Sequence, residues 1–326
     1  MTKLSIYTLK ILRKLYAQVL IFKPKEKPEF DQNPDSASQI IYETLKSDKP
    51  VMIARFGANE LTILINYLSI KSGSRSVIKY IRGEQFDWWW NVVIIKQMHE
   101  VAGFFPPEIS MIEKFCELML KDIPQVDILG SWLSDEAKVS NILHAKKVHL
   151  RHLEPFWSEM PWSRILQGKK VLIVHPFSHT IEKQYKKRKL LFGRDILPEF
   201  EIKTLKTVQS LAREKTPFAD WFEALEFMKS EIDKIDYDIC LIGAGAYGFH
   251  LAAHVKRMGK KGFHLGGALQ LLFGIRGKRW EVPNYGVKEW GIPKGSYISL
   301  INEHWVRPSE NEKPKNADVV EGACYW

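Results

Sequence analysis

Short apolar runs alternate along the chain with segments whose apolar residues recur at helical spacing. The runs VMIA, VLIV and ICLI, at residues 51–54, 171–174 and 239–242, each end near turn residues. Such runs are typical of buried central strands in a parallel sheet. Helical spacing occurs around and between them, at 38–45, 59–68, 109–120, 218–235 and 249–257. This alternation predicts an α/β fold with a single Rossmann-like domain, in which helices cover both faces of a doubly wound, mostly parallel sheet.

The first 22 residues have a different pattern. Their apolar residues recur at steps of three or four: Leu4, Tyr7, Ile11, Leu15, Val19 and Phe22. Their basic residues fall together on another arc: Lys3, Lys10, Arg13 and Lys14. The pattern predicts a basic amphipathic helix over residues 1–22. Such a helix either lies on an anionic membrane surface or docks on its own domain, and the two alternatives are equally favoured by the sequence.

Composition divides the rest of the chain. Residues 23–37 are rich in proline and charge and lack periodicity, which predicts a linker. We expect the Rossmann-like domain to cover residues 38–308. Residues 309–326 are predicted to form an extended tail that closes on the aromatic pair Tyr325 and Trp326.

The net charge of +10 and the pI of about 9.3 indicate attraction to an anionic partner. Phosphorylated small molecules and acidic membrane surfaces fit this charge, and we expect no nucleic-acid partner. Cys116, Cys240 and Cys324 are too few and too widely spaced for a disulfide framework or a zinc site. No apolar stretch is long enough to span a bilayer, and no signal peptide is evident. We therefore expect a cytoplasmic protein, with peripheral contact to the inner face of the membrane as a further expectation.

A glycine turn follows the third apolar run. Gly243, Gly245 and Gly248 have GxGxxG spacing between a predicted strand and a predicted helix. Glycines let the backbone turn sharply and approach a phosphate, whose charge the helix N-terminus favours. A dinucleotide site would also need an acidic residue about twenty residues later, but that stretch reads KKGFHLGG. The alternative is that the glycines serve only close packing of strand and helix.

The first apolar run leads into the sequence RFGANE. Arg55 could pair with a phosphate, and Glu60 would lie in the first turn of the following helix. A carboxylate in this position can act as a base or nucleophile, or can hold a sugar hydroxyl. The simpler alternative is that Asn59 caps the helix and Glu60 only favours the helix dipole.

The second apolar run ends in the sequence HPFSH. Polar groups directly after a buried strand belong at the functional edge of the sheet, so His175, Ser178 and His179 are candidates for phosphate or ribose binding. A Ser–His hydrolase is not indicated, because the serine lacks the GxSxG context. The alternative is a solvated loop with one capping serine.

Together the three segments resemble glycosyltransferases of the GT-D and GT-D-like fold, which act in bacterial surface-polysaccharide assembly. RFGANE at residues 55–60 is similar to their RFGDGE signature. The HPF segment at 175–177 and the GAGAYG turn at 243–248 are similar in order and setting. The resemblance covers about residues 40–308. It implies a single Rossmann-like domain that transfers a sugar from a nucleotide-sugar donor, expected to be a UDP-sugar, to a glycan or lipid-linked acceptor.

The resemblance also implies roles for particular residues. Glu60 would be catalytic. The donor-binding residues would be Arg55, Gly57, Asn59, His175, Ser178, His179, Gly243, Gly245, Tyr247 and Gly248. Where the family often has an acidic residue two positions before the glutamate, this chain has Ala58. We therefore expect no metal to be held by a D-x-E pair. The net positive charge would then help to stabilise the departing diphosphate.

The sequence is also consistent with two other functions. An NAD(P)-dependent oxidoreductase would suit the GxGxxG spacing, although the missing ribose acid counts against it. A non-enzymatic protein that binds an anionic membrane surface would suit the N-terminal helix and the charge.

Overall fold

The computed structural model describes residues 2–19, 28–210, 214–314, 317 and 322–326, arranged around a single seven-stranded sheet. Every pair of neighbouring strands is parallel, and the order is β3-β2-β1-β7-β6-β4-β5. The strands are β1 (Val51–Ala54), β2 (Ile128–Ser131), β3 (Lys146–His149), β4 (Lys170–Val174), β5 (Glu201–Leu205), β6 (Ile239–Ile242) and β7 (Lys261–His264). The predicted α/β fold with one Rossmann-like parallel sheet is confirmed.

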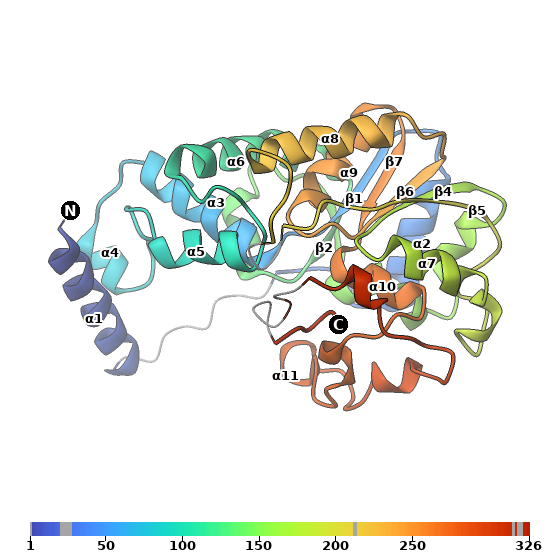
Figure 1. Cartoon of the computed structure of the whole chain (residues 1–326). Helices are drawn as coiled ribbons and strands as arrows, with labels where there is room; N and C mark the ends of the chain where they lie inside the picture. The colour runs from blue at the N-terminus through green and yellow to red at the C-terminus, as the bar shows by residue number, and fades with distance from the viewer. Residues whose placement is uncertain (1, 20–27, 211–213, 315–316, 318–321) are drawn as a thin grey trace.

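Helices cover both faces of the sheet (Figure 1). One face carries α3 (Ala58–Lys71), α5 (Val92–Glu100), α6 (Ile109–Asp122), α8 (Trp221–Asp233) and α9 (Tyr247–Arg257). The other face carries α2 (Pro34–Lys46), α7 (Ser178–Tyr185) and α10 (Leu269–Leu272). Two helices, α1 (Lys3–Val19) and α4 (Val77–Ile81), lie beyond the end of the sheet, and α11 (Val287–Trp290) follows α10.

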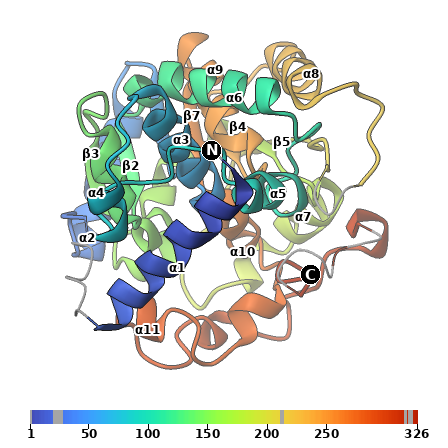
Figure 2. The same ribbon diagram turned by 90° about the vertical axis from the view of Figure 1, so that its left-hand side faces the viewer.

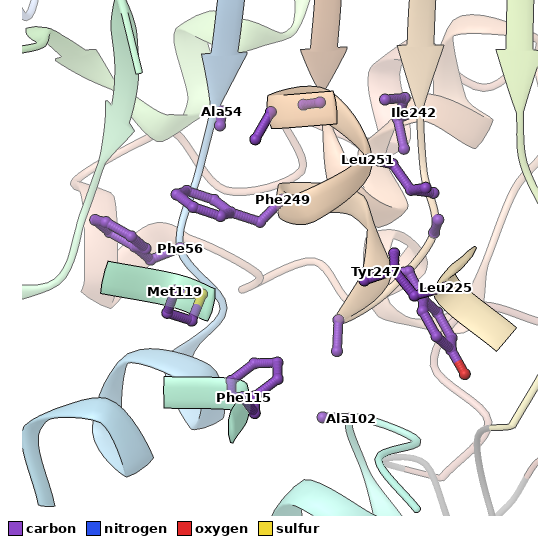
Figure 3. Packing of buried hydrophobic residues seen from close by; sticks show 14 of the residues in the cluster. Ala54, Phe56, Ala102, Phe115, Met119, Leu225, Ile242, Tyr247, Phe249 and Leu251 are labelled. Carbon is purple, nitrogen blue, oxygen red and sulfur yellow. The ribbon is translucent and has the colours of Figure 1, made fainter. Parts of the chain in front are cut away.

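Neighbouring side chains of each central strand enter different cores, because successive residues of a strand point to opposite faces. In β4, Leu172 packs into the core under α6, α8 and α9, whereas Ile173 packs into the core on the other face. Figure 3 shows the first core, where the ring of Phe56 lies 5.1 Å from the ring of Phe249 and near Met119. Burial on both faces explains why the runs at residues 51–54, 171–174 and 239–242 are apolar at every position.

The connections after the central strands diverge at the carboxyl edge of the sheet. The chain leaves β1 for α3 on one face and leaves the neighbouring β7 for α10 on the other. The neighbours β6 and β4 diverge in the same way, into α9 and α7. In open α/β sheets, ligands bind outside the carboxyl ends of the strands at such a point of divergence. The topology therefore predicts a ligand site at this edge of the sheet.

The predicted linker is partly folded. Residues 23–27 lie outside the described residues, but helix α2 begins at Pro34, four residues before the predicted start. The side chain of Asn33 caps this helix, because its oxygen accepts the N–H groups of Asp35 (2.8 Å) and Ser36 (3.1 Å). Asp31 also forms a parallel bridge with Val148 of β3. The folded domain thus begins before residue 38.

The predicted extended tail is packed onto the domain in its described part. Glu312 is buried, and its carboxylate accepts the N–H groups of His179 (2.9 Å) and Thr180 (3.4 Å) at the start of α7. Trp326 is buried too, and its ring lies 6.0 Å from that of Phe177. Burial of these side chains explains why the segment does not extend into solvent.

Helix α1 packs against α4 and crosses the end of the molecule opposite the strands β4 and β5 (Figures 1 and 2). The guanidinium of Arg13 lies 4.8 Å from the ring centre of Tyr80 in α4. The apolar residues of the other side are exposed; for Leu4 the exposed fraction is 75% and for Val19 it is 80%. Among the residues that the structure describes, no helix combines the length and the apolar character needed to cross a membrane.

We predict that Gly248→Ala lowers the melting temperature. In an open helix this change would stabilise the fold by about 0.5–1 kcal/mol. Here the added Cβ would lie 2.2 Å from the buried ring of His264, and overpacking typically costs about 1–3 kcal/mol. Each kcal/mol corresponds to roughly 2–4 °C in a chain of this size class. Differential scanning fluorimetry should therefore show a fall.

The matched control is Gly193→Ala, because the space around a Cβ at Gly193 is open. That variant should melt close to the wild type. A melting temperature for Gly248→Ala at or above that of the control would contradict the described contact between α9 and the end of β7.

Candidate functional site

An open cleft, which we call the main cleft, lies at the carboxyl edge of the sheet and has an empty volume of about 940 Å³. Residues at the carboxyl ends of five strands line it. Arg55, Trp132, His175 and Gly243 directly follow their strands, and His264 is the last residue of β7. These strands include both pairs whose connections diverge. The cleft therefore occupies the position at which open α/β sheets bind ligands.

Arg55 is the central charged group of the main cleft. Burial lowers the pKa of its guanidinium, and the nearby Glu60 carboxylate and Tyr325 partly offset this effect. Among the described residues, none forms an ion pair or a hydrogen bond with the guanidinium, which lies 5.2 Å from the ring centre of Trp132. The nearby Glu60 carboxylate offsets the burial of this cation only in part and forms no ion pair with it, so the site is suited to an anionic ligand.

Neighbouring residues fix the position of Arg55. Phe56 is fully buried against Phe249 of α9, which leaves the preceding side chain on the cleft side of the loop. Trp132 donates its indole N–H to the carbonyl of Phe56 (3.1 Å). Glu136 holds the Trp132 loop in turn, because its carboxylate accepts the N–H of Trp132 (2.9 Å). Through Glu136, the 3-10 helix Ser134–Val139 thus positions Trp132 as an aromatic wall of the cleft.

In the RFGANE segment, Asn59 does not cap the following helix, as the simpler alternative from the sequence would have it. Helix α3 begins at Ala58 with Gly57 as its N-cap, and no side chain caps it. The Glu60 side chain folds back over Gly57, where a Cβ would lie 1.8 Å from its carboxylate oxygen. Glu60, Gly57 and Asn59 all line the main cleft. The glycine therefore makes room for a carboxylate at the mouth of the cleft, next to Arg55.

The glycine turn contributes backbone N–H groups to the main cleft. Gly245 has a φ of +52°, a left-handed conformation that favours glycine. Gly243 allows three loops to approach, because a Cβ there would lie 2.5 Å from the His175 ring and 2.8 Å from the carbonyl of Gly266. Within the described part of the chain, the N–H groups of Gly245 and Ala246 have no acceptor, and both residues border the cleft. Such groups at the start of a helix favour an anion.

Two neutral histidines complete the floor of the cleft. Burial lowers the pKa of His175 to about 3, and its Nδ1 accepts the N–H of Phe177 (3.0 Å). The remaining proton is therefore on Nε2, as a donor. Burial, with a smaller effect of Arg55, lowers the pKa of His264 to about 3. Both rings are hydrogen-bonding groups at neutral pH and carry no charge.

A distant segment supplies the opposite wall. Arg279 lies over the ring of Tyr325, with 4.7 Å from its guanidinium carbon to the ring centre, and its backbone N–H bonds to the carbonyl of Cys324 (3.0 Å). Gln270 donates to the carbonyl of Tyr325 (3.0 Å). Arg279, Tyr325 and Trp326 line the main cleft. A second cation thus faces the same space as Arg55.

Four predicted donor-binding residues lie outside this lining. The N–H of His179 is bonded to Glu312, so the start of α7 that carries Ser178 is capped by the chain itself. Tyr247 points into the core, where its ring stacks on Trp221 at 4.8 Å. Gly248 packs against His264 and serves close approach of the helix.

Sequence reasoning missed the residues that reach the cleft from elsewhere: Trp132, His264, Gly266, Gly267, Gln270 and Arg279. The segment HLGG did carry a signal, because it repeats the pattern of a strand followed by glycines. Ala58 lies in the cleft lining at the position of the expected acidic residue. Within the described residues, no group of three or more His, Cys, Asp or Glu side chains is placed to hold a metal ion.

Comparisons with known proteins gave no family model, no curated protein and no solved structure that matches the chain. The resemblance to GT-D glycosyltransferases therefore stays a prediction that depends on its motifs.

Proposed function

We propose that the chain is a glycosyltransferase, which moves a sugar from a nucleotide-sugar donor, such as a UDP-sugar, to a glycan or lipid-linked acceptor. The observation that carries this proposal is the Arg55 guanidinium, which faces the main cleft without an ion pair among the described residues and whose burial the Glu60 carboxylate offsets only in part. A diphosphate would supply the missing negative charge, since guanidinium groups bind phosphate oxygens through paired hydrogen bonds.

The proposed reaction places the diphosphate between the two arginines of the main cleft. The acceptor hydroxyl oxygen forms a bond to the anomeric carbon, and the bond from that carbon to the phosphate oxygen breaks. The diphosphate leaves with the electron pair, and Arg55, Arg279 and the N–H groups of Gly245 and Ala246 stabilise its charge. Glu60 takes the proton of the acceptor hydroxyl.

The main cleft supports an NAD(P)-dependent oxidoreductase less well. In dinucleotide-binding folds an acidic residue about twenty positions after the glycine turn binds the ribose. Here the strand that follows the turn and its helix is β7, which ends in the neutral His264. Besides the Glu60 carboxylate, the site offers cations and neutral donors, a set that suits phosphate groups more than it suits a ribose pair.

We predict that Glu60→Gln abolishes transfer while the fold stays intact. The amide keeps the size of the side chain but cannot accept a proton, and loss of such a group typically lowers the rate by about 10²–10⁴. The measurement is release of UDP from a panel of UDP-sugars, with glycans and polyprenyl-linked sugars as acceptors. Gly57→Ala should also lower the rate, because the new Cβ would displace the Glu60 carboxylate.

Glu226→Gln is the control for this experiment, since Glu226 is exposed on α8 and lies outside the cleft lining. Full transfer activity in Glu60→Gln, at an unchanged melting temperature, would contradict the proposed catalytic role of Glu60.

We further propose that α1 holds the protein at the inner face of an anionic membrane. The support is an exposed row of apolar residues: Leu4, Tyr7, Ile11, Leu15 and Val19. Lys14 of the same helix is also exposed, and Val77 and Ile78 of the adjoining helix α4 add further apolar surface. Such a surface suits the boundary between headgroups and acyl chains, where basic residues meet anionic lipids.

We predict that the double change Ile11→Ser and Leu15→Ser releases the full-length protein from vesicles of phosphatidylglycerol. Ile11 and Leu15 are about half exposed in α1, so burial of each contributes roughly 1 kcal/mol, and binding should weaken by at least about tenfold. Cosedimentation measures the bound fraction. Phe227→Ser, at an exposed position of α8, should bind as the wild type does. Equal cosedimentation of the double variant and the wild type would refute membrane contact through α1.

A further inference from the structure

A second cleft adjoins the main cleft on the far side of Arg55. It has an empty volume of about 490 Å³, and it shares Arg55, Gly267, Arg279 and Tyr325 with the main cleft. Its other walls are largely apolar and include three aromatic side chains, Trp280, Tyr285 and Trp290. We call it the aromatic cleft. Because both clefts contact the same two arginines, ligands in the two would lie next to each other.

A buried carboxyl group lines the aromatic cleft. Glu154 is only 8% exposed, and its oxygens accept the indole N–H of Trp157 (2.6 Å) and the hydroxyl of Tyr297 (2.9 Å). No ion pair involves Glu154 within the part of the chain that the structure describes. Burial raises the pKa of its carboxyl to about 7, and its hydrogen bonds and the nearby Arg151 offset this effect only in part. A buried carboxyl that is not ion-paired is costly for stability, which favours a role in binding.

The aromatic side chains around Glu154 are fixed in place. The ring of Tyr285 lies 5.3 Å from that of Trp290 and 5.4 Å from that of Tyr297. Trp290 also packs on Gly286, where a Cβ would lie 2.6 Å from the indole ring. Gly286 itself has a φ of +77°. The rings are therefore held before any ligand arrives, which lowers the entropic cost of binding.

We propose that the aromatic cleft is a carbohydrate subsite that binds a sugar ring of the acceptor. Trp290 would pack on the apolar face of the ring, and Tyr285, whose ring is inclined at 84° to that of Trp290, would contact its edge. Glu154 would hydrogen-bond a ring hydroxyl at the end of the cleft. The acceptor role rests on the proposed sugar transfer, whereas carbohydrate binding at this cleft does not depend on it.

The test begins with binding in the absence of nucleotide. Methyl glycosides of glucose, galactose, mannose, rhamnose and N-acetylglucosamine are titrated onto the full-length protein and followed by saturation-transfer NMR. At least one should bind, and Trp290→Ala and Glu154→Gln should each weaken it by roughly tenfold or more. Phe227→Ala, at an exposed aromatic position of α8, should leave the binding unchanged. The proposal is overturned if no glycoside binds, or if Trp290→Ala binds as the wild type does.

Transfer kinetics separate this proposal from the proposed function. If the chain transfers sugar, Trp290→Ala should raise KM for the acceptor at least tenfold and leave KM for the donor within about twofold. Transfer with an unchanged acceptor KM would refute the acceptor subsite and leave the glycosyltransferase standing. Glycoside binding that Trp290→Ala abolishes, in a protein that transfers no sugar from any donor, would refute the glycosyltransferase and support the carbohydrate site.

Discussion

The charge of Arg55, held at the end of a central strand without an ion pair among the described residues, is the constraint on which the main cleft depends. A folded protein could lower its free energy by replacing such a group with an apolar one. Instead the surrounding structure holds it: Phe56 anchors the loop in the core, and Trp132 lies against the guanidinium. A buried charge that lowers the stability of the fold in this way is typical of a binding site.

The same guanidinium joins two spaces of different chemistry. On one side, the glycine turn and Arg279 offer N–H groups and positive charge; on the other, the rings around Glu154 offer apolar faces and a carboxyl group. A phosphate-bearing sugar and a second sugar would therefore meet at Arg55. The topology produces this meeting point, because the connections of β1 and β7 leave to opposite faces and open the edge of the sheet between them.

The sequence predicted those parts of the fold and site in which local pattern and structure agree. The strands β1, β4 and β6 are buried on both faces and so carry the apolar runs VMIA, VLIV and ICLI, whereas β3 and β5 lie at the edges and read KKVH and EIKTL. Strand β7 is central but reads KGFH, and Gly262 leaves room there for the backbone of Ala252. A sequence pattern cannot reveal such a strand, because its place depends on its neighbours.

The residues of the site were likewise predicted only where a local sequence pattern carries them. Arg55, Gly57 and Glu60 were identified because one short motif carries them into the cleft, and the side chains that reach it from distant segments, such as Arg279, were not. The resemblance of the GAGAYG turn placed Tyr247 in the site, but the ring of Tyr247 packs in the core on Trp221. Ser178 and His179 follow the right strand, yet a segment more than a hundred residues later caps their helix with Glu312.

Thermal unfolding of the wild type and of Arg55→Met, with and without UDP-sugars, NAD and NADP, tests the central claim most directly. If Arg55 is a costly cation kept for a diphosphate, the methionine variant should melt higher than the wild type without ligand. It should also lose the rise in melting temperature that a UDP-sugar gives the wild type. A variant that melts lower without ligand yet keeps the full UDP-sugar response, or a wild type that responds only to NAD or NADP, would contradict the account.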